Sequence, residues 1–158
     1  STDVTPLAVR SSRPSWMDPE TNQVILVDST ERETTALEQF DLPRERREAL
    51  EEFLSGIEYD SDRVLLVEGV GPDACHDRLE IESIRFEGDE IRADAAVVDS
   101  SDGDVGCAEA ITYSSALARV DVAGEPPDSA AVSVTDGWGE TATVTADASD
   151  SIGSDPEQ

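Results

Sequence analysis

His76 is the only histidine in the chain, so any mechanism that needs an imidazole base must use it. It lies between Cys75 and Asp77, and a thiolate at Cys75 would form a nucleophile–base pair with it. A strongly negative environment disfavours this chemistry because it raises the pKa of a thiol. A zinc site made of Cys75, His76 and Cys107 lacks a fourth ligand and the usual close cysteine spacing. We therefore predict no catalytic residue and expect His76 to be a surface residue.

Four carboxylates crowd one predicted loop: Asp99, Asp102, Asp104 and Glu109. Oxygen ligands at such spacing could hold Ca²⁺. The segment lacks the alternating order of a calcium-binding loop, and a chain with 37 acidic residues produces such clusters by chance. Calcium is therefore kept as one alternative and a metal-free loop as the other, and no other cofactor is predicted.

A glycine motif, Gly69-Val70-Gly71-Pro72-Asp73-Ala74, follows a predicted buried strand and matches the dinucleotide-binding pattern. That pattern needs a helix N-terminus to receive the pyrophosphate, whereas residues 79–86 have the two-residue period of a strand. The motif is interpreted as a plain loop. A hydrolase with paired carboxylates is also disfavoured, because nothing marks one pair among so many acids.

The charge balance excludes several partners. The 158 residues include 37 Asp and Glu against 11 basic residues, all arginine, which gives a formal net charge of −26. Nucleic acids and anionic membranes are excluded as partners because their affinity for proteins comes largely from Lys and Arg. Molar salt shortens the Debye length to ~3 Å and removes most of the self-repulsion. The composition resembles that of proteins from salt-loving archaea, and no apolar run is long enough for a transmembrane helix.

The two cysteines, Cys75 and Cys107, flank a predicted hairpin. Residues 79–86 and 90–98 read as strands on either side of Glu87-Gly88-Asp89, a turn sequence. Antiparallel pairing would bring the two cysteines together, and a disulfide would contribute about 3–4 kcal/mol through loop entropy. Two reduced thiols are the alternative. A disulfide places the chain outside the cytosol, so we expect an extracellular or surface-anchored protein whose export signal has been removed or lies outside the sequence.

The elements that position these residues belong to one predicted β-rich domain over residues 7–146, between a flexible tail at 1–6 and a disordered acidic tail at 147–158. Leu7 and Val9 open a first strand. A helix over residues 31–40 follows from a capping box of Thr30 and Glu33. A second helix after Pro43 has an apolar stripe and ends at Gly56; the stripe is Ala49, Leu50, Phe53, Leu54 and Ile57.

Every later signal is that of a strand. The predicted strands are residues 23–28 before the helices, and 63–68, 79–86, 90–98, 110–122, 132–134 and 141–145. A change of inward parity indicates a bulge near Glu82-Ser83 and a bend in residues 110–122. We therefore predict a mainly β (α+β) fold, an antiparallel sheet or small β-sandwich with two short helices inserted at about 30–56.

Both tryptophans, Trp16 and Trp138, lie in predicted loops. A loop tryptophan surrounded by polar residues is a candidate contact for a protein partner. Local packing is the alternative for each of them.

Several stretches occur in an order that resembles a known module. They are Val27-Asp28-Ser29-Thr30-Glu31, Tyr59-Asp60-Ser61-Asp62-Arg63-Val64-Leu65-Leu66-Val67, the hairpin at 79–98, and Cys107-Ala108-Glu109-Ala110-Ile111-Thr112-Tyr113. Over residues 24–122 the chain is similar to the C-terminal domain of PrcB-type protease-complex subunits and related exported bacterial and haloarchaeal proteins. Arg78-Leu79 stands where that family usually has Gly-Tyr, and Ser114 where it has Pro. The resemblance implies an exported domain without catalytic residues, which in some members associates with and stabilises a protease.

We therefore expect an exported, halophilic, non-catalytic protein-binding domain that associates with another extracellular protein such as a protease. The alternative is a calcium-stabilised component of the cell surface or matrix. The identity of the partner and the oligomeric state are not predicted from the sequence.

Overall fold

The computed structural model of the chain describes residues 2–10, 22–37, 44–72, 75–76, 78–87, 90–98, 111–121 and 127–147. Within these ranges the chain forms two helices and two four-stranded sheets. Sheet A has the order β1 (Thr2–Arg10), β6 (Thr112–Asp121), β3 (Asp62–Gly71), β2 (Gln23–Val27). Sheet B has the order β4 (Arg78–Glu87), β5 (Glu90–Val98), β7 (Ser129–Thr135), β8 (Thr141–Asp147). The mainly β fold with two short helices is confirmed.

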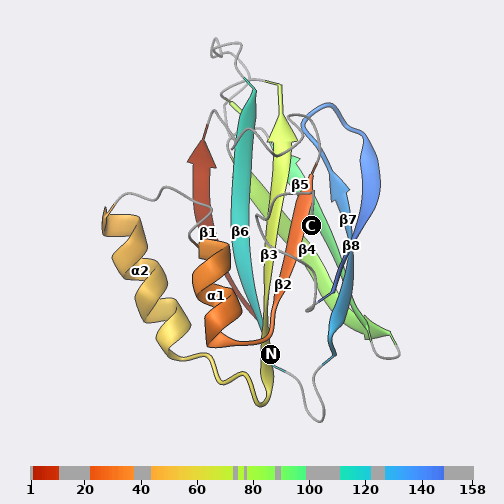
Figure 1. The fold of residues 1–158 in the computed structure, drawn as a ribbon. Helices are drawn as coiled ribbons and strands as arrows, with labels where there is room; N and C mark the ends of the chain where they lie inside the picture. The colour runs from red at the N-terminus through yellow and green to blue at the C-terminus, as the bar shows by residue number, and fades with distance from the viewer. Residues whose placement is uncertain are drawn as a thin grey trace, which may run out of the picture.

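The helices α1 (Thr30–Leu37) and α2 (Arg44–Ser55) cover one face of sheet A, and sheet B covers the other (Figure 1). Sheet A therefore lies between two cores. The core between the sheets includes Leu26, Leu65, Val67, Ile91, Ala118 and Val132. The core under the helices includes Ile25, Val27, Leu50, Leu54, Val64, Leu66 and Leu117. Because both faces are covered, residues 24–27 of β2 and 64–67 of β3 are continuous apolar runs rather than alternating ones.

Within the described part of the chain, sheet B is covered on one face only. Along β5 the side chains of Ile91, Ala93, Ala95 and Val97 are buried, and those between them are only half-buried. β4 pairs with β5 antiparallel around the predicted hairpin, and the register shifts between Ile81 and Ser83. The bulge predicted near Glu82 is therefore confirmed.

β5 and β7 are parallel neighbours, with Glu90 opposite Ser129 and Ala96 opposite Thr135. The chain leaves sheet B after β5, crosses sheet A as β6 and returns as β7, so both strands run in the same direction. No pattern in the sequence predicts this pair of strands. As a result the β4–β5 hairpin and the β7–β8 turn lie at opposite ends of sheet B (Figure 1).

The flexible tail predicted over residues 1–6 is wrong for residues 2–6, which belong to β1 and pair with Ala116–Val120 of β6. Their small polar composition and Pro6 favoured a tail. Proline is compatible with an edge strand or an irregular register, and β1 is an edge strand whose register shifts between Pro6 and Ala8. At the other end, Asp147 is the last residue of β8, and residues 148–158 lie outside the described part of the chain.

Two further expectations need correction. The helix cap is Ser29 rather than Thr30: Ser29 Oγ accepts a hydrogen bond from Arg32 N at 3.2 Å. No register shift interrupts the pairing of β6 with β3, so the bend predicted in residues 110–122 is not needed. The parity change arises because β6 is buried on both faces, with Leu117 in the core under the helices and Ala116 in the core between the sheets.

The second helix forms as predicted. Leu50 and Leu54 are buried in the core under the helices, Phe53 and Ile57 pack beside them, and Ala49 alone of the predicted stripe is exposed. Neither of the described helices is long and apolar enough to cross a membrane.

Candidate functional site

Trp138 lies in the turn between β7 and β8, and the side chain of Asp136 organises this turn. Asp136 Oδ1 accepts hydrogen bonds from Trp138 N at 2.9 Å and from Glu140 N at 3.1 Å. Asp136 N donates to Glu140 O, and Gly139, with a φ of 86°, lets the chain reverse. The backbone that carries Trp138 is therefore held by several hydrogen bonds within the turn.

The same turn is docked onto the end of β3. Gly137 N donates to Val70 O at 2.8 Å. A Cβ at Gly137 would lie 2.5 Å from Pro72 Cδ and 2.7 Å from Gly71 Cα, so only glycine allows this approach. His76 packs closely against Gly71, because a Cβ on Gly71 would lie 2.5 Å from the Cβ of His76. The turn thus joins sheet B to sheet A at this end of the sandwich.

Two large apolar side chains in the described part of the chain are exposed, Trp138 at 47% and Phe86 at 46%. They lie at opposite ends of sheet B. Phe86 is in register with Ile91, which is fully buried, and continues the inward row of the hairpin. Trp138 instead lies in a turn beyond the strands, whose backbone is held by hydrogen bonds. Of the two, Trp138 has the features expected of a protein contact.

The structure describes only some of the other residues that the sequence analysis singled out. Cys107, Asp77, Trp16 and the acidic loop of Asp99, Asp102, Asp104 and Glu109 lie outside the described residues. The described part of the chain contains no free cysteine, and the pairing of Cys75 with Cys107 stays a prediction. No three described His, Cys, Asp or Glu residues form a group that could hold a metal ion.

His76 contributes its backbone to the fold. Its carbonyl oxygen accepts a hydrogen bond from Ser114 Oγ at 3.3 Å. The glycine motif at 69–71 forms the end of β3, and the next element along the chain is the strand β4. The interpretation of the motif as a plain loop is therefore wrong for residues 69–71, which belong to a strand. The next described element is a strand, whereas the dinucleotide-binding pattern requires a helix there.

The opposite end of sheet A holds a buried polar cluster that the sequence analysis missed. Asp62 is 1% exposed, and its Oδ2 accepts hydrogen bonds from Glu58 N at 3.0 Å and Arg119 Nε at 3.3 Å. Arg63 is 8% exposed and donates to the carbonyl oxygens of Tyr59 and Pro127. Since charged residues at strand ends are usually solvated, nothing in the sequence distinguished these two.

Next to that cluster, Tyr59 and Glu33 connect the turn before β3 to α1. Tyr59 OH donates to Glu33 Oε2 at 3.1 Å. Burial raises the pKa of Glu33, and the hydrogen bond from Tyr59 partly offsets this. Burial, and then the neighbouring Glu33 carboxylate, raise the pKa of Tyr59. The phenol therefore remains protonated well into the alkaline range.

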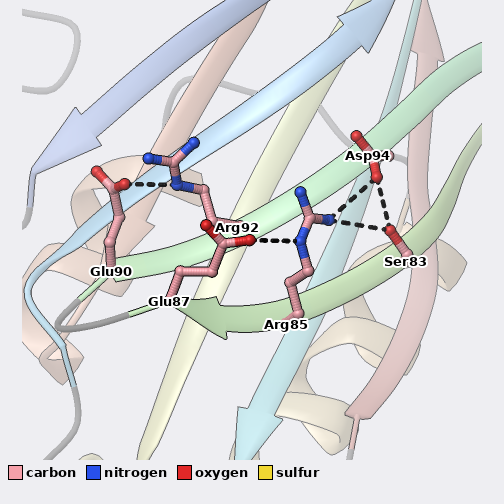
Figure 2. A network of polar contacts seen from close by, with 6 residues as sticks. All are labelled: Ser83, Arg85, Glu87, Glu90, Arg92 and Asp94. Carbon is pink, nitrogen blue, oxygen red and sulfur yellow. Dashed lines mark hydrogen bonds and ion pairs between the residues drawn. The ribbon is translucent and has the colours of Figure 1, made fainter.

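The outer face of β4 and β5 carries a network of charged side chains (Figure 2). Arg85 contacts Glu87 at 3.0 Å and Asp94 at 3.1 Å, and Arg92 lies 2.7 Å from Glu90. Hydrogen bonds from Ser83 and then Arg85 lower the pKa of Asp94. Each arginine is thus neutralised within the network although Arg85 and Arg92 are directly opposite each other. We interpret this face as solvated structure rather than as a reactive site.

Comparison with known proteins does not assign the chain to a family. No family model matches the chain, and no curated protein and no solved structure shows a significant match to it. The resemblance to PrcB-type C-terminal domains therefore stays a prediction from the sequence motifs.

Proposed function

We propose that the protein is an exported, salt-adapted domain that acts by binding another extracellular protein and performs no chemistry of its own. The observation that carries the proposal is Trp138, half-exposed on a turn that hydrogen bonds and close backbone packing hold in place. A tryptophan whose backbone is already held in place loses less conformational entropy on binding than one on a loose loop, which favours its use as an anchor. The resemblance to PrcB-type domains supports a protease as one such partner.

The environment of Trp138 indicates which partner surface would fit. Asp136 and Glu140 flank it in the turn, and the chain has a net charge of −26. A complementary partner would offer an apolar pocket with a basic or neutral rim, since like charges across an interface are unfavourable. Molar salt would screen the remaining repulsion between two acidic proteins.

The test compares Trp138→Ala with Phe86→Ala, which removes an equally exposed ring at the other end of sheet B. Wild-type and variant proteins are immobilised and exposed to a salt-rich extracellular fraction, and a retained protein is then purified and titrated against each. We expect Phe86→Ala to bind as the wild type does and Trp138→Ala to lose at least about tenfold in affinity. Equal binding by both variants would overturn the proposal. A calcium-dependent rise in unfolding temperature that Asp102→Ala abolishes would instead favour the surface-component alternative.

A further inference from the structure

The four edges of the two sheets differ in how they are protected against pairing with another strand. β4 carries charged residues along its length and a bulge between Ile81 and Ser83. β1 contains Pro6 and a register shift. At β2 the guanidinium of Arg32 covers the edge, because Arg32 Nε donates to Leu26 O at 2.6 Å. Each of these three edges therefore has a recognisable protective device.

β8 lacks such devices from Thr141 to Ala146, because Arg32 reaches only the carbonyl oxygen of its last residue, Asp147. Its first six residues, Thr141 to Ala146, contain no charge and no proline in a chain of which 30% is charged. Its register with β7 runs without a shift from Thr141 to Asp147. Among the described strands its neighbour within the sheet is β7 alone, and the side chains of residues 141–143 are exposed. An uncharged, regular edge is a template for one more strand.

Two hydrogen bonds show which backbone groups of β8 point outward. Asp136 N donates to Glu140 O, so Glu140 faces β7. Arg32 Nη2 donates to Asp147 O from outside the sheet, so Asp147 faces outward. Along an antiparallel strand, the backbone groups of successive residues face the neighbouring strand and away from it in turn. Both observations therefore indicate that the N–H and C=O groups of Thr141, Thr143 and Thr145 point away from β7. The contact between the hydroxyl oxygens of Thr135 and Thr141, at 2.7 Å, agrees, since side chains lie closer in pairs without backbone hydrogen bonds.

We propose that β8 pairs antiparallel with β8 of a second copy of the chain, about a two-fold axis at Thr143. Thr143 then lies opposite Thr143 of the second copy, and Thr141 lies opposite Thr145. Each of these pairs exchanges two backbone hydrogen bonds. The register places threonine against threonine on the outer face and Ala142 against Val144 on the inner face, so no like charges meet. The two copies of sheet B form one continuous sheet.

A second copy fits this edge because the segment is self-complementary in the sense that a two-fold interface requires. The assembly also stops at two copies, because the pairing uses both β8 edges. The charged, bulged β4 edges remain at the ends of the joined sheet. Two chains of charge −26 repel each other in dilute buffer, so the dimer should form more strongly in molar salt. The inference does not depend on Trp138 or on the proposed function.

The test measures the mass of the full chain by sedimentation equilibrium in molar NaCl over a range of concentrations, together with amide exchange. We expect a dimer of twice the 16.9 kDa chain mass, with the amides of Thr141, Thr143 and Thr145 protected in concentrated solution and exchanging faster on dilution. Thr143→Pro removes an outward N–H but no backbone hydrogen bond within the hairpin, so the fold remains and the dimer dissociation constant should rise at least about tenfold. It also removes the side-chain contact of Thr143 Oγ1 with Ser133 Oγ at 3.4 Å, which Thr143→Val removes as well. Thr143→Val keeps the N–H and should still form the dimer.

If circular dichroism shows that Thr143→Pro does not fold, Thr143→Arg takes its place, because it would bring two guanidinium groups together at the axis. A monomer at every concentration, or a dimer that these variants do not weaken, would overturn the proposal. A monomer that binds a different protein through this edge would overturn it as well and would assign β8 to a foreign strand.

Discussion

Arg119 of β6 reaches Asp62 at the start of β3, with Arg119 Nε 3.3 Å from Asp62 Oδ2. The two residues are diagonal neighbours across the strand pair, since Arg119 is opposite Val64 and Asp62 is opposite Asp121. The side chain of Asp62 is 2% exposed and that of Arg119 is 31% exposed. Water therefore reaches the cation but not the carboxylate, and the carboxylate depends on protein donors.

Replacing Asp62 by alanine should destabilise the fold. The change removes the acceptor for Glu58 N and the buried acceptor for Arg119 Nε, so we expect the free energy of unfolding to fall by about 2–3 kcal/mol. Asp128→Ala is the matched control, because its side chain is 72% exposed beside Arg63, and it should cost at most about 1 kcal/mol. Denaturant unfolding in molar NaCl measures both. Equal losses in the two variants would contradict the prediction.

Arg63 joins the turn before β3 to the segment that leads into β7. Its guanidinium donates to Tyr59 O at 2.8 Å and to Pro127 O at 3.1 Å, and its side chain is 10% exposed. Arg63→Met keeps the apolar stem but leaves these carbonyl oxygens without the donor, so we expect a loss of about 2–4 kcal/mol. Arg63→Lys should recover only part of it, because an ammonium cannot reproduce the planar fork. Arg78→Met removes an arginine whose side chain is 62% exposed and should change stability by at most about 1 kcal/mol.

Stability should depend on pH through Glu33. Burial raises the pKa of this carboxyl above its ordinary value of 4.5, so the folded state binds the proton more tightly than the unfolded state. The contribution of Glu33 to stability is therefore greatest in acid and decreases as the pH rises through the folded pKa. Subtracting the unfolding curve of Glu33→Gln from that of the wild type over this range should show the decrease. A difference that grows with pH would mean that the pKa is lowered instead.

Tyr59→Phe should raise the pKa of Glu33 further. The hydrogen bond from Tyr59 OH favours the ionised carboxylate, and phenylalanine removes that bond while it keeps the ring. Side-chain carboxyl resonances followed by NMR in wild type and variant measure the change. An unchanged titration of Glu33 would show that the hydrogen bond does not act on its pKa.

The elements that could be predicted are those with a local pattern. The stripe of Leu50, Leu54 and Ile57 specifies the second helix, and the parity change around Glu82 specifies the bulge. Parity was misleading in β6, where Leu117 and Ala118 are buried on opposite faces and alternation carries no information about a bend. The parallel pairing of β5 with β7 depends on where the chain goes between them, which no local pattern records.

In the candidate site, too, only residues with a local signal in the sequence could be predicted. Trp138 was found because a tryptophan between two strand patterns is visible in the sequence. The burial of Asp62, Arg63 and Glu33 was missed because it results from contacts with residues far away along the chain, such as that between Asp62 and Arg119, which are 57 positions apart. In a chain with 37 acidic residues, type and spacing do not distinguish a buried carboxylate from a solvated one.

Gly137→Ala should detach the turn that carries Trp138 from β3. A Cβ at this position would meet Pro72 and the backbone of Gly71 at 2.5 and 2.7 Å, neither of which can rotate away. The turn would have to move outward and weaken the hydrogen bond from residue 137 to Val70 O, so we expect a loss of about 1–3 kcal/mol and faster amide exchange at residue 137.

Gly56→Ala is the control for that substitution. It adds the same methyl group at a turn, but the nearest atom, Phe53 O, is 3.9 Å from the new Cβ, and its φ is not positive. Stability should change by no more than about 0.5 kcal/mol, with a small gain from the stiffer unfolded chain. If both alanine variants unfold with the same free energy, the packing of Gly137 against β3 contributes nothing measurable. Trp138 would then be carried by a turn held only by its own hydrogen bonds, and Gly137→Ala would leave its binding unchanged.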